Sequence, residues 1–164
     1  MLKNLSNLYK RILLNVNQED TKKSLFHLSE SLLSEKLSKI FVLKESEAIA
    51  FINWKENTLL GYKHKESFNM ITASKGISSI LQAEVLTIKN LDLDAKVEDI
   101  AIVLNTEIHI IYVLKAYPSF CLYFVFNPSY SNLVLAKSMI ASLANELSAI
   151  QHIALEKLTN KEEE

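Results

Sequence analysis

The sequence predicts an α+β fold, an α/β sandwich in which helices cover both faces of a five-stranded, mostly antiparallel sheet. The first observation behind this prediction is an almost continuous run of strand-forming residues between Val97 and Phe126. Strands in this run are apolar on both faces, whereas a half-exposed strand alternates apolar and polar residues. The second observation is that the segments on either side of the run have helical periodicity. A sheet with two apolar faces has to lie between helices, and these segments can supply them.

Two helices are expected before the first strand. Apolar residues recur every three or four positions over residues 2–16, which is typical of an amphipathic helix. Asp20 or Thr21 is then expected to cap a second helix that ends near Leu37. The apolar stripe of this second helix consists of Leu25, Leu28, Leu32, Leu33 and Leu37.

Two short strands and a long helix are expected next. The strands cover residues 40–44 and 48–54 and are joined by a turn at residues 45–47. Residues 55–65 are polar and include Gly61, which predicts a loop. The long helix covers residues 66–90 and is apolar around more than half of its circumference. A helix of this kind is either deeply buried or shared with a partner.

Three further strands and a last helix complete the expected order. The strands cover residues 99–104, 107–114 and 119–126. Asn127 is expected to cap the last helix, with Pro128 in its first position. The order is therefore helix, helix, strand, strand, helix, three strands, helix. We expect one domain over residues 1–164, with residues 1–19 as a helical extension and residues 155–164 as a charged tail.

Composition and charge argue against several classes of protein. The formal net charge is only −1 and the basic residues are scattered, which disfavours a nucleic-acid-binding surface. The N-terminal apolar segment is short and is interrupted by Lys3, Lys10 and Arg11, so we expect no membrane insertion. With one cysteine the chain can form no intramolecular disulfide, and we expect a cytoplasmic protein.

No residue pattern predicts a catalytic, cofactor or metal site. Phosphate-binding loops and dinucleotide fingerprints need several glycines, and this chain has two. The four histidines lack the spacing of metal ligands. Cys121 lies in the most apolar strand, which predicts an inert buried thiol, and His109 is expected to be structural. We therefore expect a protein that is not an enzyme.

Two segments resemble the roadblock/LC7 family. They read KIFVLKESEAIAFINW and VEDIAIVLNTEIHIIYVLKAYPSFCLYFVFNPSYSNLVLAKSMIASLANEL. The resemblance covers about residues 20–152 and lies in the order of the elements and in their apolar pattern. It implies a profilin- or longin-like fold. It also implies a non-enzymatic homodimer that binds a small Ras-like GTPase as a regulator or scaffold.

The resemblance further implies how the dimer forms, through the strand at residues 99–104 and the long helix before it. The physics of edge strands agrees, because an unpaired apolar edge is a template for aggregation and a two-fold partner covers it. The expected interface residues are Met70, Ile77, Leu81, Ile100, Ile102, Val103 and Leu104. The alternative is a monomer whose first helix covers the same surface.

Two other functions remain as alternatives. One is a small-ligand sensor module of the GAF or PAS type, which also combines an antiparallel sheet with helices but encloses a pocket beneath the sheet. The dense aromatic and β-branched filling of this chain favours a solid core instead. The other alternative is a hydrolase that uses serine or histidine.

Overall fold

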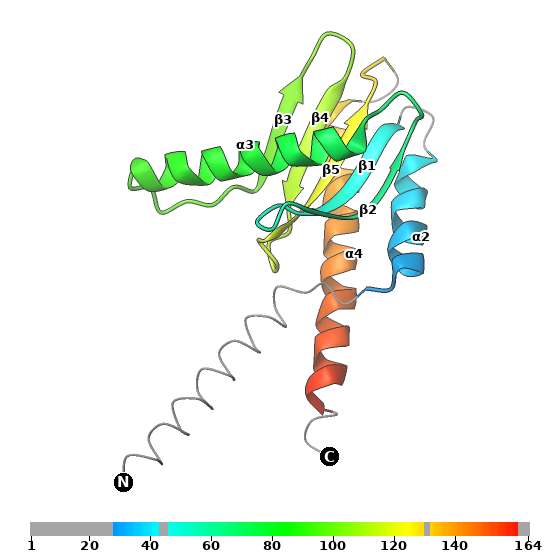
Figure 1. Ribbon diagram of the computed structural model, residues 1–164, viewed down its shortest axis with the longest axis vertical. Coiled ribbons are helices and arrows are strands. Elements are labelled where there is room, and N and C mark those ends of the chain that lie inside the picture. Colours follow the sequence, from blue (N-terminus) through cyan, green and yellow to red (C-terminus); the bar gives the residue numbers. More distant parts are fainter. Residues whose placement is uncertain (1–27, 43–45, 130–131, 161–164) are drawn as a thin grey trace. The chain divides into compact units, whose positions relative to one another are not determined.

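A five-stranded sheet organises the fold of this protein (Figure 1), which we describe from a computed structural model. The structure describes residues 28–42, 46–129 and 132–160. The chain divides into a larger unit, residues 29–150, and a smaller unit made of residues 1–28 and 151–164. In the smaller unit the described residues are Leu28 and the last turns of helix α4. The helix expected over residues 2–16 lies outside the described residues.

All neighbouring strands in the sheet are antiparallel, and their order is β2-β1-β5-β4-β3. Strand β5 therefore lies at the centre of the sheet, and β2 and β3 form its two edges. The bounds are Ser46–Asn53 for β1, Thr58–His64 for β2, Asp99–Val103 for β3, Ile108–Val113 for β4 and Phe120–Phe126 for β5. The last three strands match the sequence-based prediction to within a residue at each end.

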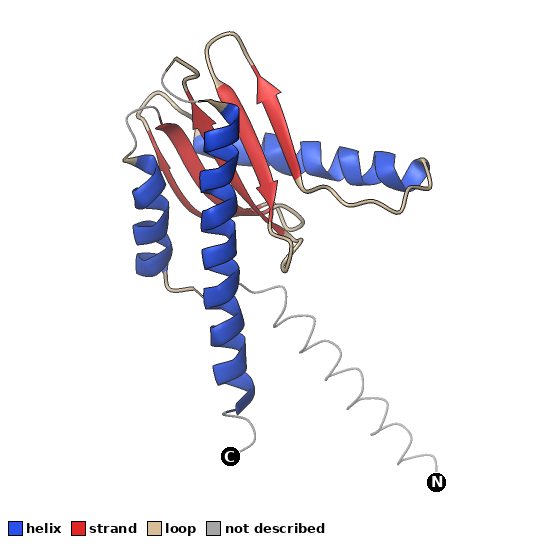
Figure 2. Ribbon diagram, turned by 180° about the vertical axis from the view of Figure 1, so that it is seen from behind, coloured by secondary structure: helices blue, strands red, loops and turns tan. Residues whose placement is uncertain are grey.

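Helices cover both faces of the sheet, which confirms the predicted fold class. Helix α3 (Met70–Asn90) lies across one face, and α2 (Glu30–Phe41) and α4 (Leu133–Asn160) cover the other (Figures 1 and 2). Successive strand residues point to opposite faces. On the α3 side, Tyr123 and Val125 of β5 pack with Leu81 of α3 in one buried cluster. Large aromatic rings fill the opposite face. The rings of Phe51 and Phe120 stack there with centroids 5.7 Å apart.

Burial on both faces holds for the central strands and not for the edges. Every residue of β5 is buried, and seven of the eight residues of β1 are buried. Edge strands β2 and β3 contain no fully buried residue. Residues 99–104 were expected to form a strand with two apolar faces between helices, but β3 is only partly buried because it lies at an edge of the sheet.

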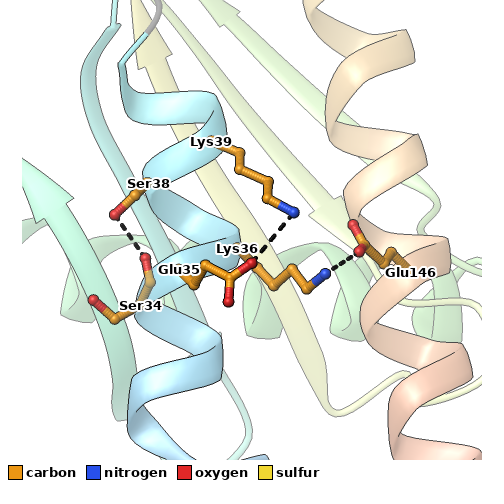
Figure 3. Close-up of polar contacts among 6 residues, drawn as sticks. All are labelled: Ser34, Glu35, Lys36, Ser38, Lys39 and Glu146. Atoms are coloured by element: carbon orange, nitrogen blue, oxygen red, sulfur yellow. Dashed lines mark hydrogen bonds and ion pairs between the residues drawn. The ribbon is translucent and has the colours of Figure 1, made fainter.

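Helices α2 and α4 are joined by an ion pair between Lys36 and Glu146 (Figure 3). The side chain of Lys36 is 12% exposed, so this ammonium group is largely withdrawn from water. The hydrogen bond that Lys36 donates to the Glu146 carboxylate raises the pKa of Lys36 above its ordinary value. On the surface of α2, Lys39 also pairs with Glu35 one turn earlier, at 3.4 Å.

The structure corrects the predicted second helix at both ends. Leu28 and Ser29 are not helical, and α2 begins at Glu30 with the Ser29 hydroxyl accepting a hydrogen bond from the Leu32 amide at 3.3 Å. Asp20 and Thr21, the expected caps, lie outside the described residues. The helix continues to Phe41 with Val42 as its C-cap, so the strand expected at residues 40–44 was wrong for residues 40–42, and residues 43–44 lie outside the described residues. A short apolar run is compatible with either structure, and its periodicity does not distinguish them.

The first hairpin consists of β1 and β2, joined by residues 54–57. Within this turn Asn57 has φ 55°, a left-handed conformation that asparagine tolerates. Residues 58–64, which were expected to be a loop, form edge strand β2. Their polar character reflects the exposure of that edge and does not indicate irregular structure.

Gly61 in β2 allows helix α2 to approach the sheet closely. A Cβ atom added there would lie 2.7 Å from Cδ2 and 3.0 Å from Cγ of Leu33, which is buried. These distances are shorter than ordinary van der Waals contact. The glycine is needed here for space, since it does not have a positive φ.

The remaining helices begin later than predicted. Asn69 caps α3, so the helix begins at Met70 and not at residue 66. The side chain of Asn132 accepts a hydrogen bond from the Leu135 amide, and α4 begins at Leu133. The predicted cap, Asn127, instead accepts a hydrogen bond from the Ser129 amide in a turn. Helix α4 then continues through residues 155–160 of the expected charged tail.

Among the described residues, α4 is long and apolar enough by length and composition to cross a bilayer, over Leu133–Ala154. A helix that forms part of a hydrophobic core meets the same criterion. In this structure Ala136, Ile140, Leu143, Ala144 and Leu147 of α4 are buried.

The two glycines provide a matched pair of stability tests. Gly61→Ala should lower the free energy of unfolding by about 1–3 kcal/mol, because the new methyl group crowds Leu33. Gly76→Ala, in the interior of α3, should raise it by about 0.5–1 kcal/mol, because no atom lies within 4 Å of the added Cβ. Urea denaturation measures both changes. A rise in both variants would contradict the assigned packing at Gly61, and a fall in both would contradict the open surroundings of Gly76.

The pH dependence of stability provides a second test, through Cys121. This thiol is fully buried in β5, and burial raises its pKa. Above about pH 8.5 the thiol ionises in the unfolded chain while it stays protonated in the folded one. The stability that is present below this pH is therefore lost as the pH rises, by up to about 1.4 kcal/mol per pH unit.

Urea denaturation between about pH 8 and 9, where the thiol ionises in the unfolded chain and tyrosine is still largely protonated, measures this loss. Cys121→Ala should show a shallower fall in the free energy of unfolding than the wild type. Val125→Ala removes a buried neighbour that does not titrate and should keep the wild-type slope. Equal slopes for all three proteins would show that Cys121 ionises alike in both states.

Candidate interaction surface

Strand β3 is an edge of the sheet that carries apolar side chains. Its inner side pairs with β4, where Ile100 is opposite Ile111 and Ile102 is opposite His109. No strand in the described part of the chain pairs with its outer side. Val103 is 66% exposed and Leu104 43%, whereas Ile100 and Ile102 are half-buried. We refer to residues 100–104 as the β3 edge.

Helix α3 extends beyond the sheet on the same side. Its C-terminal half passes β3, and the chain then turns back to enter that strand (Figure 1). Leu86 near the end of the helix, and Leu91 and Leu93 in the following segment, are all more than half exposed. We refer to these three leucines as the α3 overhang. Together with the β3 edge they concentrate exposed apolar side chains on one side of the protomer.

The structure separates the seven residues expected at the interface into two groups. Ile100, Ile102, Val103 and Leu104 lie at the β3 edge. Met70, Ile77 and Leu81 are buried in the protomer's own core, where they pack against the sheet. Exposed apolar residues of the α3 overhang were not selected from the sequence. The sequence showed only that the helix has a broad apolar surface. This pattern does not indicate which side of the helix faces the sheet.

The β3 edge is held in place at its first residue. Asp99 forms an ion pair with Lys137 of α4, which lies on the opposite face of the sheet from α3. Next to Asp99, Glu98 pairs with Lys115 at 3.2 Å and raises the pKa of that lysine. The amide of Val113 also donates a hydrogen bond to the carbonyl of Glu98 at 3.0 Å. These contacts fix the strand without using its outer side.

A chain of three polar side chains lies beside the β3 edge. The Tyr123 hydroxyl is 2.7 Å from Nδ1 of His109, and Nε2 of His109 is 2.9 Å from a carboxylate oxygen of Glu107. Burial, with a smaller effect of the Glu107 charge, raises the pKa of Tyr123 and keeps its hydroxyl neutral. The neutral hydroxyl can donate to Nδ1 while Nε2–H donates to Glu107.

This arrangement positions side chains and offers no nucleophile. The Tyr123 side chain is 1% exposed and the Cys121 thiol is fully buried, so neither can reach a substrate in solution. Among the described residues, no group of three or more His, Cys, Asp or Glu side chains is placed to hold a metal ion. The described surface presents the apolar β3 edge beside the exposed leucines of the α3 overhang.

No protein-family model matches the chain, and no curated protein matches it significantly. Solved structures do match. The roadblock/LC7 domain from Streptomyces avermitilis superposes with a TM-score of 0.62 at 8% identity, covering 71% of this chain and 95% of that one.

Two MglB structures superpose on this chain with TM-scores close to that of the roadblock/LC7 domain. Myxococcus xanthus MglB has a TM-score of 0.66 at 9% identity, covering 77% of this chain and 92% of its own. An MglB described as having a tetrameric arrangement has a TM-score of 0.64 at 16% identity, covering 79% and 95%. These matches span nearly the whole length of each relative. The protein has a roadblock/LC7-type fold.

Proposed function

We propose that the protein is a non-enzymatic, dimeric regulator or scaffold in the cytoplasm that binds a small Ras-like GTPase. The observation that carries this proposal is the unpaired, apolar β3 edge beside the α3 overhang, on a roadblock/LC7-type fold. One of the similar structures, an MglB, is described as tetrameric, which supports self-association for a chain of this fold.

The dimer uses the unpaired side of β3. A two-fold axis beside this strand brings the same strand of a second copy alongside in antiparallel orientation, so that the sheet continues from one protomer into its partner. Backbone groups on the outer side of β3 then gain hydrogen-bond partners. Val103 and Leu104 lose their exposure to water, which is favourable by about 25 cal/mol per Å² of apolar surface.

The α3 overhang completes the same interface. Helix α3 passes the β3 edge of its own sheet (Figure 1), so in the proposed dimer the overhang of one protomer reaches over the sheet of the other. Leu86, Leu91 and Leu93 are thereby covered together with the strand. Met70, Ile77 and Leu81 are buried in the protomer's own core and support the helix from beneath. The two apolar features of the protomer are thus covered in one association.

The proposed GTPase partner supplies the nucleotide chemistry. With two glycines the chain has no phosphate-binding loop of its own. A regulator of this kind acts by binding one nucleotide state of the GTPase more tightly than the other, which shifts the population of that state. The resemblance to the roadblock/LC7 family supports this class of partner.

Dimerisation is tested with a pair of matched substitutions. Val103→Asp places a carboxylate in the proposed interface, where burial of two unpaired charges should raise the dissociation constant at least about 100-fold. Val42→Asp makes the same change at a valine of similar exposure outside the β3 edge. Light scattering should give twice the 18.7-kDa protomer mass for the wild type and Val42→Asp, and one protomer mass for Val103→Asp.

A wild type that has one protomer mass would contradict the dimer and favour the monomer whose first helix covers this surface. Dimers that persist in Val103→Asp would show that the chain associates through another face. Circular dichroism confirms that both variants are folded before the masses are compared.

Partner binding is tested by affinity capture from the native cytoplasm in the presence of GDP or of a non-hydrolysable GTP analogue. We expect a small GTPase to be enriched in one nucleotide state. With that GTPase purified, calorimetry should show affinities for the two states that differ by about tenfold or more. Capture of no GTPase in either state, or equal affinities for both states, would count against the proposed function.

A further inference from the structure

We propose that a cavity beneath the C-terminal half of α3 binds a small carboxylate with an apolar body. The cavity has a volume of about 240 Å³ and an apolar lining. Its wall consists of Trp54, Val85, Ile88, Val97, Val113 and Pro118. These residues belong to the turn after β1, to α3, to the segment that enters β3, to β4 and to the turn before β5. Nothing in the proposed binding of a GTPase requires this cavity.

Hydrogen bonds hold the wall of the cavity in position. The indole N–H of Trp54 donates to the carbonyl of Pro118 at 2.8 Å, which joins the β1–β2 turn to the β4–β5 turn. The backbone carbonyl of Trp54 accepts a hydrogen bond from the side chain of Gln82 on α3, at 3.4 Å. Trp54 is only 5% exposed, so its ring is a fixed part of the structure. The cavity is therefore formed before any ligand binds.

Two ammonium groups give the cavity its charge preference. Lys55 and Lys96 line it beside the apolar wall, and both are exposed to solvent. Nζ of Lys55 lies 5.8 Å from the centroid of the Trp54 ring. Within the described ranges of the chain, no ion pair involves either lysine. An anionic group at the cavity is therefore complementary in charge to these two lysines.

The size of the cavity limits the body of the ligand. Its volume lies just below the range of about 300–1,000 Å³ that is typical of sites for drug-sized ligands. A single aromatic ring or a short alkyl chain fits such a space. The apolar lining favours this body over a sugar or a nucleotide, whose hydroxyl groups would lack partners there. The chemical class is thus a small aromatic or aliphatic acid, for which we expect a dissociation constant on the order of 0.1–1 mM.

The fluorescence of Trp54 reports binding directly, because it is the only tryptophan of the chain and lines the cavity. The full-length protein is titrated with hydrocinnamate and, separately, with hydrocinnamyl alcohol, which has the same ring and linker without the charge. We expect a saturable change of fluorescence with both compounds, and an affinity about fivefold higher for the acid. Thermal unfolding gives a second readout, since a ligand of the native state raises Tm.

A matched pair of lysine variants tests the charge preference. Lys96→Met keeps the apolar stem and removes the charge, and should weaken binding of hydrocinnamate about threefold without affecting the alcohol. Lys75→Met removes a charge from the exposed side of α3, outside the cavity, and should leave both affinities unchanged. Val85→Phe fills the cavity and should abolish the binding of both compounds.

Three results would overturn this proposal. The first is that neither compound causes a saturable change in fluorescence at millimolar concentrations. The second is that the acid and the alcohol bind with equal affinity. The third is that Lys96→Met and Lys75→Met change the affinity for hydrocinnamate equally. Each variant is first shown to unfold cooperatively on heating, so that loss of binding is not caused by loss of the fold. The titrations are repeated on Val103→Asp, so that failure of the cavity is distinguished from failure of the dimer.

Discussion

The whole structure depends on the burial of strand β5 between two layers of helices. Every residue of β5 is buried, and its backbone pairs with β1 on one side and β4 on the other. Apolar side chains of this strand therefore need cover on both faces of the sheet, which α3 supplies on one face and α2 with α4 on the other. The helices bury the edge strands β2 and β3 less completely. These two strands therefore expose side chains to solvent.

The two edges of the sheet differ in a way that bears on function. Strand β2 carries polar residues such as Lys63 and His64, and α2 packs closely on it because Gly61 leaves room. Charged and polar side chains are a common protection of an edge strand against association. Strand β3 has an exposed valine and two isoleucines, with one charged residue at its beginning. This asymmetry is the physical basis for proposing that self-association uses β3.

Helix α3 accounts for both functional proposals because it extends past the sheet. One part of its C-terminal half carries the exposed leucine of the overhang, and another part forms a wall of the cavity with Val85 and Ile88. The chain must then return from the end of the helix to the start of β3, which brings Lys96 and Val97 to the cavity. The proposed site for a small acid next to the proposed dimer surface combines features of the regulator and of the sensor module that the sequence left as an alternative.

The sequence by itself determined the fold class, the order of the elements and the last three strands. The strands in residues 97–126 carry apolar side chains on both faces. This pattern is typical of strands that are buried between two layers of helices. The boundaries of the first half required tertiary packing. Ile40 and Phe41 end a helix, and residues 58–64 form a strand, because of the neighbours that they contact. The helix and strand propensities of both segments are nearly equal, so long-range contacts decide which of the two structures forms. For the same reason only the structure showed which side of α3 faces water, and only the structure brought Trp54, Val85, Lys96 and Pro118 together around one cavity.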